Sequence, residues 1–346
     1  MQITYRNLEL TKRYPLRISR GESAGSINLL VTLDDDGVTG IGEAAPGEAT
    51  GAATAADCQR HLEVFVDAHD LVASSPWDAW RAARDGGVAP CAYAALDMAW
   101  WDALGRRCGQ PLYRVLGLPR RSEPTSVTVG ILAPEIVRER VPELLARTGA
   151  RFLKVKLGSP KGVDADRAMF AAVGDAVAGH DIGIRVDANG GWSLDQARSM
   201  MRWLAGRGVE YIEQPLVQGC EDQLSDLFRD RALPIYVDES CNFAADVPGL
   251  APAVDGVNVK LMKCGGITEA LRIVATARAH GLKTMIGCMG ESSVAISAAA
   301  ALGVLFDFVD LDSHLNLLPD PARGARLEGG VVLPTDDPGH GARLTC

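Results

Sequence analysis

Two lysines, Lys154 and Lys156, interrupt the apolar stretch RFLKVKLG at 151–158. The bulky apolar residues of this stretch predict a β-strand, and residues two apart in a strand face the same side. Neighbouring ammonium groups disfavour each other's charge, and a lysine that has lost its proton can serve as a general base. The pair therefore indicates proton transfer on one face of a strand.

Three carboxylates end later apolar stretches: Asp187 in RVDAN, Glu213 in IEQP and Asp238 in VDES. A single charge at a strand end can simply reach solvent. Three carboxylates that converge on one cavity instead repel each other and raise their pKa values unless a cation lies between them. Mg²⁺ suits such oxygen ligands, and no histidine stands at a predicted strand end, which disfavours zinc.

A third lysine, Lys260 in NVKLM, follows the carboxylates along the chain. If the strands form a ring, it lies nearly opposite Lys154 and Lys156. One base on each side of a planar carbanion is what a racemase or epimerase requires. A metal ion that holds the substrate carboxylate would stabilise the resulting enediolate by several kcal/mol. These residues therefore favour proton abstraction beside a carboxylate.

The segments that carry these residues repeat along the chain from about residue 125, at a spacing of roughly 25 residues that is typical of strand–helix units. Amphipathic segments at 134–149 and 193–208 predict two of the helices, each ending at a glycine suited to a C-cap. The sequence therefore predicts a (β/α)8-type barrel, with the active site at the C-terminal ends of its strands. The eight predicted strands are 125–131, 151–158, 181–189, 209–215, 234–240, 256–262, 283–289 and 307–313.

Residues before the repeat have a different pattern. The segment 26–46 predicts two strands joined by an Asp–Gly turn, and 91–109 predicts a helix. The Pro- and Gly-rich tail contains one more strand-like piece at 329–334. The predicted division is an α+β capping (specificity) domain at 1–120, the barrel with the active site at 121–318, and a C-terminal segment at 319–346 that packs back on the capping domain.

Composition narrows the class of protein. The 346 residues are 47% hydrophobic and 23% charged, and the net charge of −9 argues against binding to nucleic acid or to an anionic membrane surface. No apolar run is long enough to span a bilayer, and the first residues carry charges where a signal peptide needs an apolar stretch. The eight cysteines are scattered without a CxxC, which predicts free thiols and a cytoplasmic protein.

The chain resembles the enolase superfamily, in the muconate-cycloisomerase-like subgroup, over essentially its whole length. The motifs that carry the resemblance are KVK, RVDANGGW, IEQP, VDES and VNVKLMKCGGI. The resemblance implies that Asp187, Glu213 and Asp238 bind one Mg²⁺ per subunit. It also implies a homo-oligomer.

The same resemblance implies roles for the lysines. Lys156 and Lys260 are the acid/base pair, and Lys154 is the neighbour that tunes Lys156. Burial and the neighbouring ammonium groups are expected to lower a lysine pKa. Lys263, three residues after Lys260 and just before the turn CGG, is expected to make a loop or structural contact only.

The stretch FVDLDSHLNL contains Asp310 and Asp312 and resembles the eighth strand of dipeptide epimerases of the L-Ala-D/L-Glu epimerase type. By that resemblance the two aspartates hold the α-ammonium of a dipeptide. Two carboxylates in a partly dry cleft form a strong cation site; the alternative is a helix N-cap with a solvent contact. The further substrate-binding candidates are Thr128, Asn189, Cys288, Met289 and Arg20.

Segment 13–26 is expected to be the specificity loop of the capping domain. Arg17 and Arg20 are candidates for a substrate side-chain carboxylate, but Glu22 lies beside them and position 23 is a serine. Glu22 or Glu291 would instead favour a cationic or polar side chain. The preferred side chains therefore stay open at the level of sequence.

The function predicted is a Mg²⁺-dependent dipeptide epimerase that inverts the α-carbon of the C-terminal residue by two-base proton transfer between Lys156 and Lys260. The alternatives on the same scaffold are an N-acylamino-acid racemase, an o-succinylbenzoate synthase and a cycloisomerase. Their substrates lack the ammonium that the Asp310/Asp312 pair would bind. A barrel that only binds ligand would not need both bases, and a pyridoxal-phosphate barrel has no use for three converging carboxylates.

Overall fold

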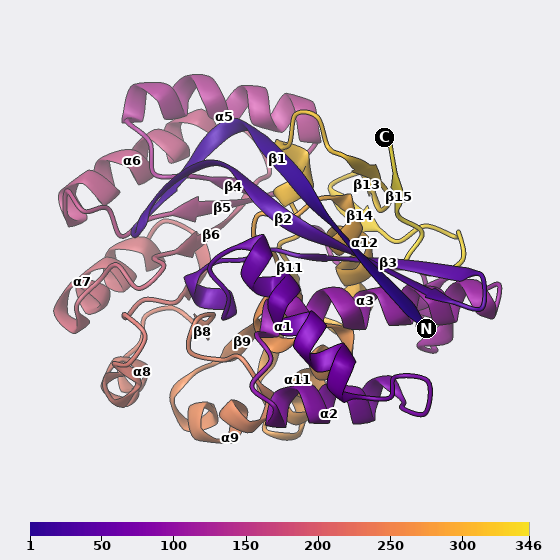
Figure 1. Ribbon diagram of the computed structural model, residues 1–346. Helices are drawn as coiled ribbons and strands as arrows, with labels where there is room; N and C mark the ends of the chain where they lie inside the picture. The colour runs from indigo at the N-terminus through magenta and orange to yellow at the C-terminus, as the bar shows by residue number, and fades with distance from the viewer. Residues whose placement is uncertain (346) are drawn as a thin grey trace.

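The computed structural model describes residues 1–345. In Figure 1 a barrel of parallel strands with outer helices lies beside a smaller unit, built from the first residues of the chain, and the yellow C-terminal tail returns to that unit. The predicted fold class, a (β/α)8-type barrel with an α+β capping domain, is confirmed. The boundaries 1–120, 121–318 and 319–346 stay a prediction.

Eight parallel strands form the barrel in the described part of the chain, and they neighbour one another in sequence order. A parallel bridge between Thr125 and Val309 joins the first strand to the last. Each of the eight predicted strands is present, because runs of β-branched and apolar residues favour strands buried on both faces. The strands are β4 (Ser126–Val129), β5 (Phe152–Lys156), β6 (Gly183–Asp187), β7 (Val209–Glu213), β8 (Ile235–Val237), β9 (Gly256–Lys260), β10 (Lys283–Gly287) and β11 (Phe308–Val309).

Helices follow the strands and cover the outside of the barrel (Figure 1). The two predicted helices are present. The first ends at Gly149 in the left-handed conformation, as its C-cap glycine predicts, whereas the second ends earlier, at Ala205. The helices are α5 (Pro134–Thr148), α6 (Val163–Ala176), α7 (Leu194–Ala205), α8 (Leu224–Arg229), α9 (Val247–Leu250), α10 (Leu261–Cys264), α11 (Ile267–Ala279) and α12 (Ser293–Ala300).

The capping domain packs an antiparallel sheet on a long helix. Asp36 and Gly37 make the predicted turn between the second and third strands. A Cβ at Gly40 or Gly42 would lie 2.0 Å from a backbone oxygen of the long helix, so only glycine allows this close packing. The elements are β1 (Gln2–Ile18), β2 (Gly21–Asp35), β3 (Val38–Ala44), α1 (Ala55–Ala68), α2 (Pro76–Asp85), α3 (Pro90–Arg107) and α4 (Leu112–Val115).

The segment 13–26, predicted as a loop, is a β-hairpin. Strand β1 continues to Ile18 and β2 begins at Gly21, which leaves only Ser19 and Arg20 between them. Apolar and polar residues alternate in this part of β1, so one face of the hairpin turns toward the barrel and the other face turns toward solvent. In Figure 1 the hairpin crosses above strands β4 to β6. The prediction of a loop is therefore wrong.

The C-terminal segment returns to the capping domain, as predicted. His340 pairs through Nε2 with the backbone oxygen of Ile41 at 2.8 Å, and Arg106 on α3 donates to the backbone oxygen of Ala342 at 3.2 Å. The predicted strand at 329–334 is present within the tail, whose strands are β12 (Ala322–Arg323), β13 (Arg326–Glu328), β14 (Val331–Leu333) and β15 (Arg343–Leu344).

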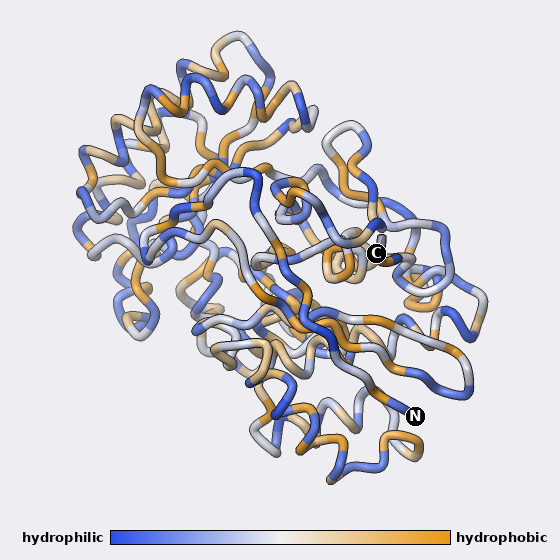
Figure 2. Tube along the Cα trace, turned by 45° about the horizontal axis from the view of Figure 1, so that its top comes forward, coloured by the Kyte–Doolittle hydropathy of each residue, from blue (hydrophilic) through white to orange (hydrophobic). Residues whose placement is uncertain are grey.

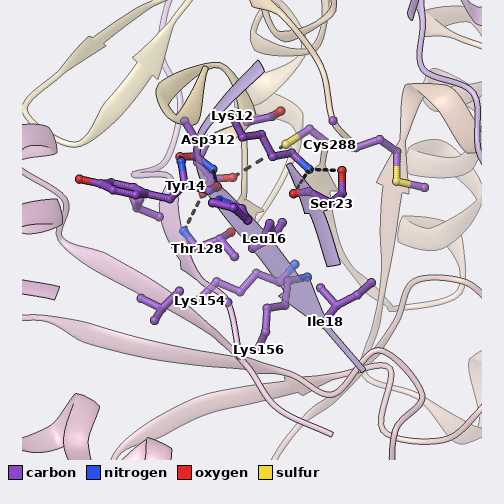
Figure 3. A pocket seen from close by; sticks show the side chains of 18 of the residues that line it. Lys12, Tyr14, Leu16, Ile18, Ser23, Thr128, Lys154, Lys156, Cys288 and Asp312 are labelled. Carbon is purple, nitrogen blue, oxygen red and sulfur yellow. Dashed lines mark hydrogen bonds between the residues drawn. The ribbon is translucent and has the colours of Figure 1, made fainter. Parts of the chain in front are cut away.

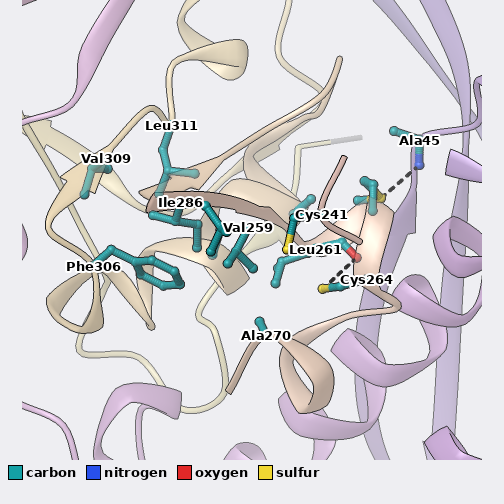
Figure 4. Packing of buried hydrophobic residues seen from close by; sticks show 14 of the residues in the cluster. Ala45, Cys241, Val259, Leu261, Cys264, Ala270, Ile286, Phe306, Val309 and Leu311 are labelled. Atoms are coloured by element: carbon teal, nitrogen blue, oxygen red, sulfur yellow. Dashed lines mark hydrogen bonds between the residues drawn. The ribbon is translucent and has the colours of Figure 1, made fainter. Parts of the chain in front are cut away.

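Figure 2 shows hydrophobic stretches along the inner strands and alternating colours along the outer helices. Outward-facing side chains of the barrel strands, such as Val259 and Ile286, pack with Leu261 and Ala270 in one buried cluster (Figure 4). The same cluster reaches the capping domain at Ala45. Of the helices within 1–345, none has the length and hydropathy needed to cross a membrane.

Asp97 on α3 joins the two domains. Its buried carboxylate accepts hydrogen bonds from the backbone and the hydroxyl of Thr268, at the start of barrel helix α11. We expect Asp97→Ala to lower the free energy of unfolding by about 1–3 kcal/mol, because a buried helix N-terminus loses its acceptor. Urea unfolding measures the loss. The exposed Asp67→Ala on α1 is the matched control; if both variants lose the same stability, Asp97 makes no such link.

Candidate active site

A cavity of about 410 Å³ opens at the C-terminal ends of the barrel strands, beneath the β1–β2 hairpin. Side chains from β1, β4 and β5 point into it in Figure 3, together with Asp312, which follows β11. Most of the predicted catalytic and substrate-binding residues line this cavity, namely Arg20, Thr128, Lys154, Lys156, Asn189, Lys260, Cys288, Met289, Asp310 and Asp312. The barrel and the hairpin thus bring together residues that lie almost 300 positions apart, from Arg20 to Asp312.

Lys154 lies at the centre of a charge cluster in the cavity floor. Its Nζ lies 2.7 Å from Glu213 Oε2, 2.7 Å from Asp310 Oδ2 and 3.3 Å from Asp187 Oδ2. The lysine side chain is only 1% exposed, so its charge requires these carboxylates. Lys154 therefore connects the predicted metal ligands to the predicted ammonium site.

The other lysines each pair with one carboxylate. Lys156 Nζ lies 2.6 Å from Asp187, and Lys260 Nζ lies 2.7 Å from Asp238. Lys263, outside the cavity lining, lies 2.8 Å from Asp238 and donates to backbone oxygens at the end of β8 and beyond. As expected, Lys263 makes a structural contact, although it touches a predicted metal ligand.

Within 1–345 no three or more His, Cys, Asp or Glu side chains form a ready-made metal site, because lysines lie between the carboxylates. The donor set nevertheless suits Mg²⁺, since Asp187, Glu213 and Asp238 supply oxygens from three neighbouring strands. Glu213 Oε2 and Asp238 Oδ1 are buried and accept no well-directed hydrogen bond, even though lysine nitrogens lie near them. Each of these two oxygens already faces an ammonium group, at 2.7 and 2.8 Å, so these positions favour a cation.

Burial and mutual repulsion decide the protonation of these groups. Burial, together with the charge of Asp187, raises the pKa of Glu213 to about 8. Burial alone would also raise the pKa values of Asp187 and Asp238, but the neighbouring lysines outweigh it and hold both below their ordinary value.

The lysine pKa prediction is wrong for Lys154 and Lys260. Burial does disfavour their charge, as expected, but the attraction of Asp310 for Lys154 and of Asp238 for Lys260 is larger. Both pKa values therefore lie above that of an ordinary lysine. The error arose because the sequence shows the neighbouring lysines but not which carboxylates reach them.

Two residues with a strained backbone conformation lie just after the carboxylates Asp187 and Glu213 in the chain. Asn189 and Gln214 have φ values of 42° and 37° without being glycine, a conformation that costs free energy and is common at functional sites. Asn189 donates its backbone N–H to Asp187 at 2.7 Å, and Gln214 Oε1 accepts the backbone N–H of Asp238 at 2.9 Å. The strained turns thus orient the carboxylate of Asp187 and hold the backbone at the end of β8.

The aspartates of the eighth strand are both in the cavity. Ser126 donates to Asp310 at 2.7 Å, and the backbone N–H of Thr128 donates to Asp312 at 2.6 Å. Lys154 also pairs with Asp310, whereas no lysine pairs with Asp312 in the described chain. Burial and the charge of Asp310 raise the pKa of Asp312 to about 6. Asp312 is thus a partly buried acceptor that a substrate cation would stabilise.

Residues 137–345 match the family model described as enolase C-terminal domain-like, and residues 2–117 match the mandelate racemase/muconate lactonizing enzyme N-terminal domain. The chain belongs to the enolase superfamily. The family predicted from the KVK, VDAN, IEQP and VDES motifs is therefore confirmed.

Curated relatives within the superfamily are dipeptide epimerases. A hydrophobic dipeptide epimerase of Roseobacter litoralis is 62% identical over all of this chain and 99% of its own, and one of a Flavobacteria bacterium is 55% identical over 99% and 98%. A dipeptide epimerase of Enterococcus faecalis, solved with Mg and the dipeptide L-Leu-L-Tyr, has a TM-score of 0.91 and 31% identity, covering 99% of this chain and 98% of that chain.

In this enolase-superfamily member Arg20 reaches the barrel from the hairpin turn. Its guanidinium donates to the backbone oxygen of Asn189 at 2.9 Å and to Glu239 at 2.6 Å. Glu239 is nearly buried, and its charge outweighs the effect of burial, so the pKa of Arg20 is raised. Arg20 therefore holds the hairpin on the barrel, and its charge is already neutralised.

The other candidate specificity residues lie at different positions relative to the cavity. Arg17 and Glu22 form an exposed ion pair at 2.8 Å on the hairpin, with Glu22 at the cavity rim. Glu291 lies outside the cavity lining: it is buried, accepts the backbone N–H of Met289 at 2.7 Å, and burial raises its pKa to about 8. The idea that Glu291 meets a substrate side chain therefore gains no support.

Sequence reasoning did not assign functional contacts to four residues. Asn258 donates to Glu213 at 2.8 Å, Ser126 orients Asp310, and Glu239 neutralises Arg20. Lys12 lines the cavity from β1. The sequence does place Asn258 on the same strand face as Lys260, two residues before it, which could have indicated a place in the site. Nothing in the sequence around Ser126, Glu239 or Lys12 indicates their contacts.

Proposed function

We propose that this enzyme epimerises dipeptides at the α-carbon of the C-terminal residue. The observation that carries the proposal is that one cavity is lined by two pairs of side chains of opposite charge, the lysines Lys156 and Lys260 and the aspartates Asp310 and Asp312. A dipeptide has a reacting α-carbon, which the two lysines would flank, and an ammonium several atoms away, which the two aspartates would bind. The similarity to curated dipeptide epimerases over the whole chain supports the proposal.

We assign Asp187, Glu213 and Asp238 to a single Mg²⁺ per subunit. Glu213 Oε2 and Asp238 Oδ1, which are buried beside lysine ammonium groups, support this assignment, as does the Mg in the structure of the Enterococcus faecalis relative. When bound, the ion would supply positive charge to the substrate carboxylate and so lower the cost of the negative charge that develops on it.

The chain's own groups carry the proton. In the proposed reaction one of Lys156 and Lys260 removes the α-proton and leaves an enediolate, and the other returns a proton on the opposite face. Lys154, held by three carboxylates, adds fixed positive charge beside Lys156. The Asp310/Asp312 pair fixes the ammonium, which keeps the α-carbon between the two bases.

The C-terminal side chain is proposed to be apolar. Arg20, which contacts the loops after β6 and β8, is paired with Glu239 and is not free for a substrate carboxylate. Ile18 and Val129 contribute apolar surface to the cavity. The "hydrophobic dipeptide epimerase" names of the two relatives agree with this preference.

The test is proton exchange in D₂O. The protein with Mg²⁺ is incubated with pooled L,L-dipeptides, and mass gain at the C-terminal residue is read by mass spectrometry. We expect gain in dipeptides with apolar C-terminal residues and none after the metal is chelated. Gain in N-acylamino acids with none in any dipeptide would overturn the proposal and favour a racemase on the same scaffold.

Two further proposals concern the cellular compartment and the oligomeric state of the protein. The free cysteines described, Cys58, Cys91, Cys108, Cys220, Cys241, Cys264 and Cys288, support a reducing compartment, and we propose the cytoplasm. A homo-oligomer is also proposed, on the resemblance alone. Light scattering of the purified protein decides its oligomeric state.

A further inference from the structure

Lys12 brings a positive charge without an acidic partner into the cavity. Its Nζ donates to Ser23 Oγ at 3.0 Å and to the backbone oxygen of Ser23 at 3.4 Å, and it forms no ion pair with a carboxylate of residues 1–345. The side chain is partly buried, which lowers its pKa. Figure 3 shows Lys12 beside Ser23 and close to Cys288, at the cavity wall. A desolvated ammonium of this kind favours an acceptor from a ligand.

The position of Lys12 indicates which end of a dipeptide it faces. Lys12 forms a backbone bridge with Leu317, just after the short helix η6 (Ser313–Asn316) that follows Asp312. The proposed ammonium site is thus on the Lys12 side of the cavity. Arg20 instead contacts the loops after β6 and β8, on the side of the proposed metal ligands. Lys12 therefore lies nearer the N-terminal residue of a bound dipeptide.

The nearby acidic side chain does not neutralise Lys12. Glu22 at the cavity rim is paired with Arg17, and its side chain is 46% exposed. The apolar neighbours Leu16 and Leu315 also line the cavity. An N-terminal side chain here would run along apolar surface and end at an ammonium.

We propose that Lys12 selects the N-terminal residue, favouring a side chain that ends in a carboxylate or amide oxygen, as in glutamate or glutamine. The inference rests on the proposed dipeptide epimerase function and extends the substrate range beyond purely hydrophobic dipeptides. The C-terminal residue stays apolar, since the cation at its end of the cavity is neutralised by Glu239.

The test compares L-Glu-L-Leu, L-Gln-L-Leu and L-Leu-L-Leu in the exchange assay, with the wild type and Lys12→Met. We expect Lys12→Met to lower kcat/KM for the Glu and Gln dipeptides at least about tenfold, the loss typical of a hydrogen bond to a charged group. L-Leu-L-Leu should change less than about threefold, since it offers Lys12 no acceptor. Lys12→Arg should keep part of the preference because it keeps the charge.

Arg13→Met is the matched control, since Arg13 is the next residue of β1 and is exposed on the opposite face; it should change none of the three dipeptides. An equal loss for all three dipeptides in Lys12→Met would overturn the inference. Calorimetric titration of L-Glu-L-Leu with Mg²⁺ present separates the two proposals. If the wild type exchanges no dipeptide but binds L-Glu-L-Leu more tightly than Lys12→Met does, only the proposed function fails. Equal affinities overturn the role of Lys12.

Discussion

We expect Lys156→Ala and Lys260→Ala each to slow epimerisation strongly, while each variant still exchanges the α-proton of one epimer of the substrate. The loss in epimerisation is expected to be roughly 10²–10⁴-fold, the usual contribution of a positioned general base. The remaining lysine can still remove and return a proton on its own face. The two variants should therefore exchange opposite epimers of the same dipeptide in D₂O.

The physical basis is the separation of the two lysines in the barrel. Lys156 stands at the end of β5 and Lys260 at the end of β9, four strands apart in an eight-stranded sheet. Side chains from opposite strands reach a bound α-carbon from opposite faces. A proton taken on one side can then return on the other, which inverts the centre.

Chiral separation of L,L- and L,D-dipeptides after incubation in D₂O measures this prediction. Lys161→Ala, an exposed lysine in the loop after β5, is the matched control and should leave exchange of both epimers intact. Circular dichroism checks that each variant folds, because Lys156 and Lys260 pair with buried carboxylates. If both variants exchange the same epimer, the two-base assignment is wrong.

The barrel was predictable because its signal is local and repeated. Each strand is a short apolar run, and each functional charge stands at the end of such a run, as Asp187 does at the end of β6. Parallel order then fixes which strand ends meet. The hairpin at 13–26 was not predicted because Arg13, Arg17 and Arg20 are typical of a polar loop. Strand β1 pairs with β2 through backbone hydrogen bonds, which the side-chain charges do not indicate.

Contacts between distant segments were not predictable. Arg20 meets Glu239 across 219 positions, and Lys154 meets Asp310 across 156. The sign of the lysine pKa shifts depends on such contacts, because burial and opposite charges act in opposite directions. Lys12 is part of no motif, and its candidate role follows from its place in the cavity and from the absence of an ion pair with any carboxylate of residues 1–345.

The aspartate pair leads to the second large expected effect. Asp310 also holds Lys154 at 2.7 Å, so a change there would disturb the charge cluster as well as the substrate. Asp312 pairs with no lysine of residues 1–345, and the backbone N–H of Thr128 can donate equally well to an amide oxygen. Asp312→Asn therefore removes one negative charge and leaves the local hydrogen bond in place.

We expect Asp312→Asn to raise KM for free dipeptides roughly 10- to 100-fold, the cost of losing a hydrogen bond between two charged groups, with a smaller change in kcat. The same dipeptides with an acetylated N-terminus carry no ammonium, so their slower exchange should be unaffected or improved. Exchange kinetics at several substrate concentrations separate KM from kcat. Equal losses for free and acetylated dipeptides would mean that Asp312 shapes the cavity and does not bind an ammonium, which would favour an N-acylamino-acid substrate for the two lysines.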